Sequence, residues 1–140
     1  MQSITLTVHT TINQNLLAVW DCYTKPEHIV KWNFASDDWH CPAATNDFRV
    51  GGKFSYTMAD RDGSFSFDFS GTFVQIFDKK HIEILLDDNR KVWLDFSENE
   101  NENETTIVEK FEAENENTPE LQQTGWQMIL NNLKKHAESL

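Results

Sequence analysis

Apolar and polar side chains alternate along much of this chain with the period of two that is typical of β-strands. The alternation covers residues 3–12 and returns after Gly51. Turn-forming residues at 60–63 and 87–89 divide the second region, so the pattern predicts about six strands joined as antiparallel hairpins. The apolar positions that share a face within each strand are Ile4, Leu6, Val8, Phe54, Tyr56, Met58, Phe65, Phe67, Phe69, Phe73, Ile82, Ile84, Leu86, Val92, Leu94, Phe96, Ile107 and Phe111.

Three other segments carry apolar residues at helical spacing. Two short helices are predicted after the first strand, one capped by Asn13 and one over residues 26–32 with Pro26 in its first turn. A third helix is predicted to begin at Thr118, whose hydroxyl can cap it, and to continue for about 20 residues. The apolar face of this last helix consists of Leu121, Trp126, Ile129, Leu130, Leu133 and Ala137.

Two segments show neither period. Residues 33–50 combine Pro42 with small polar side chains, and we predict a loop there that carries Trp39 and His40. Residues 98–104 read ENENENE, a low-complexity acidic stretch that predicts a solvated hairpin tip.

An antiparallel sheet with one apolar face needs an element that covers this face. The predicted C-terminal helix is the element long enough to do so. We therefore predict an α+β fold in which a curved antiparallel sheet of about six strands grips a long C-terminal helix, with two short helices after strand one. The length of 140 residues predicts a single domain over residues 1–140.

The charge balance disfavours several classes of partner. The chain has 12 Lys+Arg against 23 Asp+Glu, a formal net charge of −11. This excess repels phosphate backbones, and no segment supplies a basic stripe, so we do not expect nucleic-acid binding. Anionic membrane surfaces are disfavoured for the same reason. No apolar run approaches the ~20 residues that span a bilayer, so membrane insertion is not expected.

The N-terminus and the cysteines indicate the cellular compartment. Residues 1–5 have neither the basic region nor the apolar stretch of a signal peptide. Cys22 and Cys41 lie in separate segments and form no disulfide framework, which predicts reduced thiols. We therefore expect a cytoplasmic protein, acting as a monomer or weak dimer.

Several short motifs are spread from the first helix to the last. They are Val19-Trp20; Thr24-Lys25-Pro26-Glu27 with Trp32; Trp39-His40 with Pro42; Asn46-Asp47-Phe48-Arg49-Val50-Gly51-Gly52; Asp62-Gly63-Ser64-Phe65; Phe67-Asp68-Phe69 with Gly71; and Gly125-Trp126. With the order of elements, they resemble the helix-grip fold of the START-related superfamily called SRPBCC. The resemblance is strongest to the branch named for the activator of heat-shock protein 90 ATPase. Members of this branch often carry a histidine shortly before the terminal Gly-Trp, and residues 121–124 contain none.

The resemblance implies a deep, mostly apolar cavity between the sheet and the terminal helix. We therefore expect the chain to bind a small hydrophobic or amphipathic molecule, such as a lipid or an aromatic or polyketide-like compound. The branch name implies an alternative, a chaperone-associated interaction domain of the stress response. A third alternative, found elsewhere in the superfamily, is a cyclase- or hydrolase-like enzyme. We favour binding over catalysis.

Aromatic residues are the main basis for predicting a pocket. The chain has 10 Phe, 5 Trp and 2 Tyr, which from pattern alone fit an ordinary core, whereas the resemblance favours a pocket wall. Tyr56 and Arg49 are the expected polar anchors, although Arg49 could instead pair with Asp47. The predicted ligand-binding residues are Trp39, Arg49, Phe54, Tyr56, Phe67, Phe69, Trp93, Trp126 and Leu130.

Motifs for catalysis and for metal binding are weak. His40 is the one side chain that we nominate as a general acid or base, and a histidine hydrogen-bonded to backbone is the alternative. Cys41 beside His40 does not predict a thiol enzyme, because neighbouring side chains of an extended segment point apart. The histidines lack the spacing of a zinc protease, and Phe69 stands where a calcium loop at residues 60–63 would need its glutamate. We expect no metal and no cofactor.

Overall fold

The computed structural model describes residues 4–100 and 103–140 of the chain. Its elements are β1 (Thr5–Ile12), α1 (Leu16–Thr24), α2 (Pro26–Ile29), β2 (Trp39–Asn46), β3 (Lys53–Asp60), β4 (Ser66–Phe77), β5 (His81–Leu86), β6 (Lys91–Glu98), β7 (Thr105–Glu112) and α3 (Pro119–Glu138). Three predictions fall partly on residues outside these ranges. They are the start of the first strand at residue 3, the absence of a signal peptide at residues 1–5, and the acidic hairpin tip at residues 98–104.

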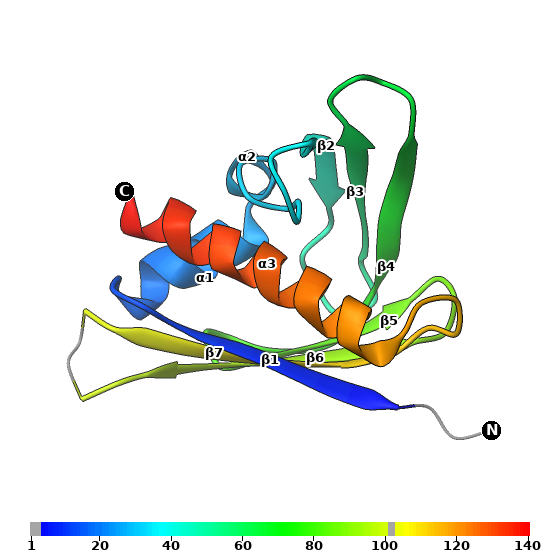
Figure 1. Ribbon diagram of the computed structural model, residues 1–140. Helices are drawn as coiled ribbons and strands as arrows, with labels where there is room; N and C mark the ends of the chain where they lie inside the picture. Colours follow the sequence, from blue (N-terminus) through cyan, green and yellow to red (C-terminus); the bar gives the residue numbers. More distant parts are fainter. Residues whose placement is uncertain (1–3, 101–102) are drawn as a thin grey trace.

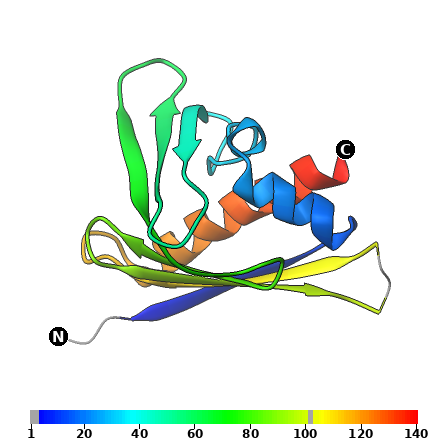
Figure 2. The same ribbon diagram turned by 180° about the vertical axis from the view of Figure 1, so that it is seen from behind.

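One antiparallel sheet contains all seven strands, in the order β1-β7-β6-β5-β4-β3-β2. The sheet curves strongly, so that β2, β3 and the start of β4 stand nearly upright on the remaining strands, and α3 lies across the concave side (Figures 1 and 2). A register shift between Phe73 and Gln75 of β4 marks a bulge, which bends a strand and increases its twist. This confirms the predicted α+β helix-grip fold.

The core lies between the concave face and α3. Alternate residues of each strand face inward, as the period of two predicts, and α3 places Leu130, Leu133 and Ala137 against them at spacings of three and four. Leu133 is fully buried, which is worth about 2 kcal/mol for a side chain of this size. The strand residues beneath the helix include Val8, Ile12, Leu94, Phe96, Ile107 and Phe111, all buried.

Helix α3 also covers the free edge of β1. Nε2 of Gln123 donates to the carbonyl oxygen of Thr7 at 2.9 Å, and Nε2 of Gln127 donates to that of His9 at 3.0 Å. Unpaired edge groups invite pairing with other chains. The glutamines occupy some of these groups and fix the angle of the helix on the sheet.

The helix starts are set by capping side chains. As predicted, Thr118 caps α3: its Oγ1 accepts from the backbone N–H of Leu121 at 3.2 Å, and Pro119 occupies the first turn. The cap of α1 is Asn15, whose Oδ1 accepts from Ala18 N at 2.8 Å, and not Asn13. The backbone N–H of Asn13 instead donates to Glu138 in α3. Helix α2 ends at Ile29, three residues before the predicted end at residue 32.

The prediction of a loop between residues 33 and 50 is wrong in part, because residues 39–46 form β2. This edge strand gives the sheet seven strands where about six were predicted. Its register shifts between His40 and Ala43, at Pro42, which has no N–H for a regular ladder. The proline and the bulge obscure the period of two, so the pattern alone did not reveal a strand here.

The turn between β2 and β3 depends on two glycines. Gly51 has φ of +85°, a left-handed conformation that glycine adopts without strain. A Cβ on Gly52 would collide with the carbonyl oxygen of Asp47. The bend at Gly51-Gly52 therefore requires glycine for a different reason at each residue.

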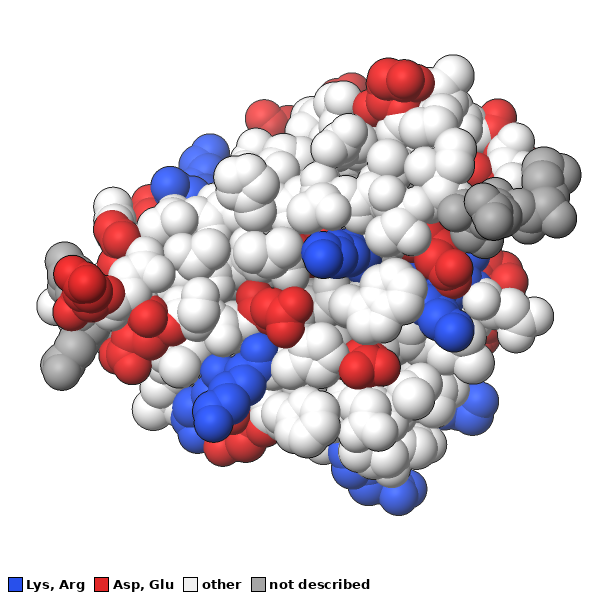
Figure 3. All heavy atoms as spheres, turned by 90° about the horizontal axis from the view of Figure 1, so that it is seen from below, with Lys and Arg blue, Asp and Glu red and all other residues white. Residues whose placement is uncertain are grey.

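The convex face of the sheet is open to solvent. It carries basic and acidic side chains side by side, separated by uncharged residues (Figure 3). No helix in the described part of the chain is long and apolar enough to cross a membrane.

Candidate functional site

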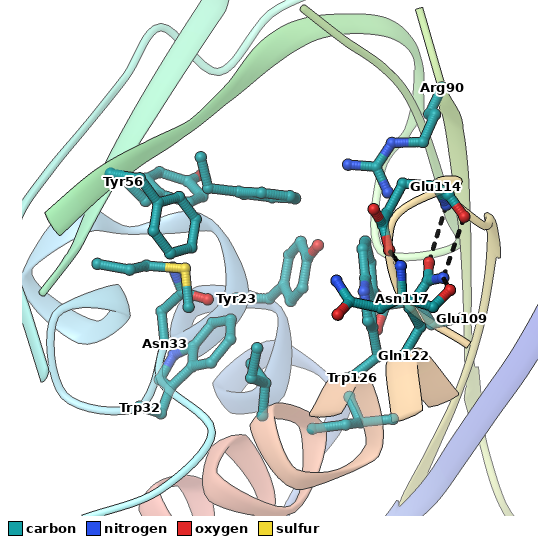
Figure 4. Close-up of a pocket in the computed structure, with 15 residues that line it drawn as sticks. Tyr23, Trp32, Asn33, Tyr56, Arg90, Glu109, Glu114, Asn117, Gln122 and Trp126 are labelled. Carbon is teal, nitrogen blue, oxygen red and sulfur yellow. Dashed lines mark hydrogen bonds between the residues drawn. The ribbon is translucent and has the colours of Figure 1, made fainter. Parts of the chain in front are cut away.

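A cavity of about 260 Å³ lies between the upright strands, the concave face and α3 (Figure 4). Strands β3, β4 and β7, helices α1 and α3, and the segments that follow α2, β5 and β7 all contribute to its wall. The residues that line it are Tyr23, Trp32, Asn33, Tyr56, Met58, Phe67, Phe69, Arg90, Glu109, Glu114, Asn117, Gln122, Trp126, Ile129 and Leu130.

Ring contacts hold the aromatic part of the wall. The indole of Trp126 stacks on Phe111, with ring centroids 4.0 Å apart and planes within 5°, and meets Phe69 edge-on at 5.9 Å. On the opposite side, Tyr23 stacks on Trp32 at 5.6 Å. Rings fixed by neighbouring rings form a wall with a defined shape, and such walls suit flat or branched apolar molecules.

The polar end of the cavity is built around Gln122 of α3. Its Nε2 donates to the carbonyl oxygens of Glu114 and Asn117 at 3.1 and 2.8 Å, and its Oε1 accepts from the backbone N–H of Glu114 at 2.8 Å. The Glu114 carboxylate accepts from the backbone N–H groups of Glu116 and Asn117, and these bonds lower its pKa. The segment between β7 and α3 is thereby fixed against the helix.

Glu109 is the buried acid of the site. It belongs to β7, exposes 8% of its surface, and lines the cavity on the same side as Glu114 and Gln122 (Figure 4). Burial raises the pKa of Glu109 to about 8, because an apolar environment disfavours the charged form.

Two tyrosine hydroxyls face the same space. Burial raises the pKa of Tyr23 well above its usual value of 10.0, and Glu109 contributes to the shift as a nearby negative charge. Burial also raises the pKa of Tyr56 to about 12, although Asn46 Nδ2 donates to its hydroxyl at 3.3 Å. Both phenols therefore stay protonated at neutral pH and can donate a hydrogen bond.

Several residues predicted to bind a ligand lie in the cavity wall. They are Tyr56, Phe67, Phe69, Trp126 and Leu130. Their role in binding remains a prediction.

Two other predicted aromatic residues lie outside the wall. Phe54 is buried in the core against Tyr56 and Phe73, and its ring lies 3.0 Å from where a Cβ on Gly71 would be. Trp39 packs edge-on against Phe65 and Phe67 near the tip of the upright hairpin. The prediction that Phe54 and Trp39 line the cavity is therefore corrected.

Trp93 lies on the opposite face of the sheet. Its neighbours Val92 and Leu94 point into the core, so the alternation of the strand directs Trp93 to the convex side, where it borders a separate hollow with Glu83 and Lys91. The strand period noted in the sequence already implies this orientation.

Arg49 and His40 also lie away from the cavity. Arg49 Nε donates to Asp47 Oδ2 at 2.7 Å on an exposed turn, which is the structural alternative considered above. His40 Nδ1 lies 3.0 Å from the carbonyl oxygen of Ala59, so it donates to the backbone of the neighbouring strand. Neither geometry supports a role as polar anchor or as acid or base within the cavity.

The sequence reasoning missed several wall residues, among them Tyr23, Trp32, Arg90 and Glu109. Tyr23 and Trp32 belong to the helical segments, which the pattern assigned only to packing. Glu109 carried a usable signal, because it stands between the inward residues Ile107 and Phe111 of one strand. A charged residue at an inward position is rare in a core, which makes Glu109 a candidate for a functional residue.

One group of potential metal ligands occurs among the described residues. Cys22, His28 and His136 bring their ligand atoms within 4.8 Å of one another. His28 Nδ1 and His136 Nε2 are hydrogen-bonded at 2.9 Å, so the imidazoles already satisfy each other. Burial raises the pKa of Cys22 to about 11. The thiol is therefore protonated and unreactive at neutral pH.

The curved sheet, the gripped helix and the cavity between them define a helix-grip protein of the SRPBCC superfamily. Residues 15–138 match the family described as activator of Hsp90 ATPase homolog 1-like protein, and the chain belongs to this family. No curated protein matches the chain in sequence.

Solved structures agree with this assignment. The AHSA1-like protein from Aeromonas hydrophila is 38% identical, with a TM-score of 0.90 over 97% of this chain and 93% of that one. A protein from Cytophaga hutchinsonii is 44% identical, with a TM-score of 0.78 over 98% and 92%. A protein from Nitrosomonas europaea shares the fold at 19% identity, with a TM-score of 0.81 over 97% and 95%.

Proposed function

We propose that the chain binds a small hydrophobic or amphipathic molecule in the cavity between the sheet and α3. The observation that supports this most directly is a space of about 260 Å³ bordered by six aromatic side chains, Tyr23, Trp32, Tyr56, Phe67, Phe69 and Trp126. The size is close to the lower end of pockets that take small organic ligands.

Energetics support an occupied cavity. At ~24 cal/mol per Å³, a sealed empty cavity of this size would cost about 6 kcal/mol, and since this cavity is partly open to solvent, water fills it when no ligand is bound. A ligand that fills it recovers contacts with the rings, whereas water satisfies only the polar end. The same argument favours a ligand with an apolar body and a polar group.

Native mass spectrometry of freshly purified protein tests this proposal. We expect an additional mass that disappears on denaturation. A calorimetric panel of fatty acids and aromatic compounds then measures affinity, with Ile129→Phe as the variant that fills the cavity. Met128→Phe is the matched control, because Met128 is the neighbouring residue of α3, does not line the cavity and is 38% exposed. Absence of any binder, or equal binding by both variants, would contradict the proposal.

We also propose a second function that follows from the family match, stimulation of a heat-shock protein 90 ATPase. The measurement is the ATPase rate of the purified chaperone with and without this chain. An unchanged rate at saturating concentration would dismiss it. Both functions fit a cytoplasmic site of action, and the two free cysteines, Cys22 and Cys41, accord with a reducing compartment.

A further inference from the structure

The environment of the Glu109 side chain is apolar in every direction along the sheet. Its register partners are Val8 on β1 and Leu94 on β6, and the inward residues before and after it on β7 are Ile107 and Phe111. In a packed core, a position surrounded by these four apolar residues would ordinarily hold an apolar residue as well. A carboxyl group here weakens the core, which points to a use other than packing.

The Glu109 carboxyl also lacks a partner within the protein. Across residues 4–100 and 103–140, no hydrogen bond or ion pair reaches its oxygens. Since the side chain is more than nine-tenths buried and lines the cavity, the cavity is the one place from which a partner can reach it. Among the described residues, Asn33 Nδ2 is the one fully buried side-chain nitrogen or oxygen atom without a partner, so the Glu109 oxygens are open to the cavity.

The charged and titratable groups around Glu109 are few. Tyr23 from α1 and Tyr56 from β3 line the cavity with neutral hydroxyls, and Arg90 and Glu114 lie at its rim (Figure 4). Arg90 Nε donates to Asp88 Oδ2 at 2.8 Å, and its positive charge contributes to the lowered pKa of Glu114. The residues of α3, β1 and β6 that pack near Glu109 are uncharged: Gln122, Trp126, Val8 and Leu94.

We infer that the ligand is an organic amine with an apolar or aromatic body, and that Glu109 binds its ammonium group. This inference rests on the proposed ligand-binding function. A carboxylate supplies the counter-charge and hydrogen-bond acceptors for the ammonium, and the faces of Trp and Tyr rings attract cations that are removed from water. The surrounding rings would hold the remainder of the molecule.

The same features argue against an anionic ligand. Above pH 8, where Glu109 is ionised, a ligand carboxylate would face two carboxylates, Glu109 and Glu114, and a guanidinium whose Nε already donates to Asp88. A net charge of −11 on the whole chain would also repel it and attract a cation. At pH 8 and above, fatty acids should therefore be weaker ligands than amines of the same size.

Binding of an ammonium ion is coupled to loss of a proton. Below pH 8 the free Glu109 carboxyl is protonated, and it must release this proton to solvent to pair with the ammonium. A primary alkylamine remains protonated to pH ~10, as lysine does. The affinity therefore rises with pH by up to about tenfold per unit and reaches a plateau above pH 8. The tyrosines and Glu114 do not titrate between pH 6 and 9, given the directions of their pKa shifts.

Three compounds of nearly equal shape test the inference by calorimetry: 4-phenylbutylamine, 4-phenyl-1-butanol and 4-phenylbutyrate. At pH 8 we expect the amine to bind at least tenfold more tightly than the alcohol, and the carboxylate least tightly. Glu109→Gln should lose at least tenfold in affinity for the amine and keep its affinity for the alcohol. Glu98→Gln, an exposed residue on β6, removes the same charge far from the cavity and should change neither.

The outcomes separate the two proposals. If the alcohol binds but the amine shows no preference, or if Glu109→Gln binds the amine unchanged, the role of Glu109 is overturned and the ligand-binding function stands. If Glu114→Gln rather than Glu109→Gln abolishes the preference, the anchor has been assigned to the wrong carboxylate. If none of the compounds, nor any from the wider panel, binds the native chain, both proposals fail. Circular dichroism of each variant confirms that it folds.

Discussion

The indole of Trp126 lies flat on the phenyl ring of Phe111, joining α3 to β7 with ring centroids 4.0 Å apart. One face of the indole thus packs on the sheet, while the residue also lines the cavity and meets Phe69 at the side. A single side chain therefore both secures the helix and forms part of the binding wall. Changes at Trp126 should affect stability and ligand affinity together.

Replacing Trp126 by Ala removes the stacked contact and enlarges the cavity. We expect a loss of about 2–4 kcal/mol in the free energy of unfolding, because truncation of large aromatic side chains in partly buried sites has costs of this order. Trp126→Phe retains a ring on Phe111 and should lose less than half as much. Urea denaturation followed by circular dichroism measures both. Equal losses in the two variants would show that the stacking contributes little.

How far the sequence predicts this fold depends on the element. Strands that are buried on one face alternate cleanly, and the residues of β5 and β6 were assigned correctly from that pattern. The edge strand β2 was missed, since Pro42 and a bulge break its period. The curvature of the sheet, which creates the cavity, depends on long-range packing that no local pattern records.

The candidate site was predictable where the wall coincides with the alternating face of a hairpin or with the apolar face of α3, which supplies Trp126 and Leu130. Tyr56, Phe67 and Phe69 were found in this way. Trp39 and Phe54 share the aromatic character of these residues, but one lies beyond the wall and the other beneath it. Residue type cannot distinguish a ring that borders a space from one that fills it, because this depends on where the strands bend.

Two glycines should respond in opposite directions to alanine. A Cβ on Gly71 would lie 2.7 Å from the carbonyl oxygen of Leu85 and 3.0 Å from the Phe54 ring, so β4 and β5 would have to separate. We expect Gly71→Ala to lower the free energy of unfolding by about 1–3 kcal/mol. A Cβ on Gly125 meets nothing within 4 Å, and alanine favours the helix. Gly125→Ala should therefore raise stability by about 1 kcal/mol.

Thermal and urea denaturation of these two single variants measures the contrast. Both substitutions add the same methyl group, so each serves as the control for the other. A destabilised Gly125→Ala would indicate that α3 packs more closely at this point than the described contacts show.

Protonation of His136 should lower the free energy of unfolding in mild acid. Burial lowers its pKa, and His28 and Lys31 contribute as nearby positive charges. Since the pKa is lower in the folded chain than in the unfolded chain, the unfolded chain binds the proton more readily as the pH falls through the range below 6.5. Comparison of His136→Gln, which cannot titrate, with the native chain isolates this contribution from the opposing one of Glu109. The free energy of unfolding of His136→Gln should rise relative to that of the native chain as the pH falls from 7.5 to ~5.5, and a difference that does not change with pH would exclude His136.

Glu109 has the opposite pH dependence, over the range from pH 4.5 to 8. Its pKa is about 8 in the folded chain and near 4.5 when unfolded, so between these values the folded chain holds a proton that the unfolded chain has lost. The stability that this proton contributes is complete below pH 4.5 and is lost as the pH rises to 8. Gln has nearly the shape of the protonated acid and does not titrate. Glu109→Gln should therefore match the native chain near pH 4.5 and exceed its free energy of unfolding by on the order of 4 kcal/mol at pH 9. Urea denaturation of both proteins across this range measures the difference, and a difference that does not change with pH would mean that Glu109 is ionised in the folded chain throughout.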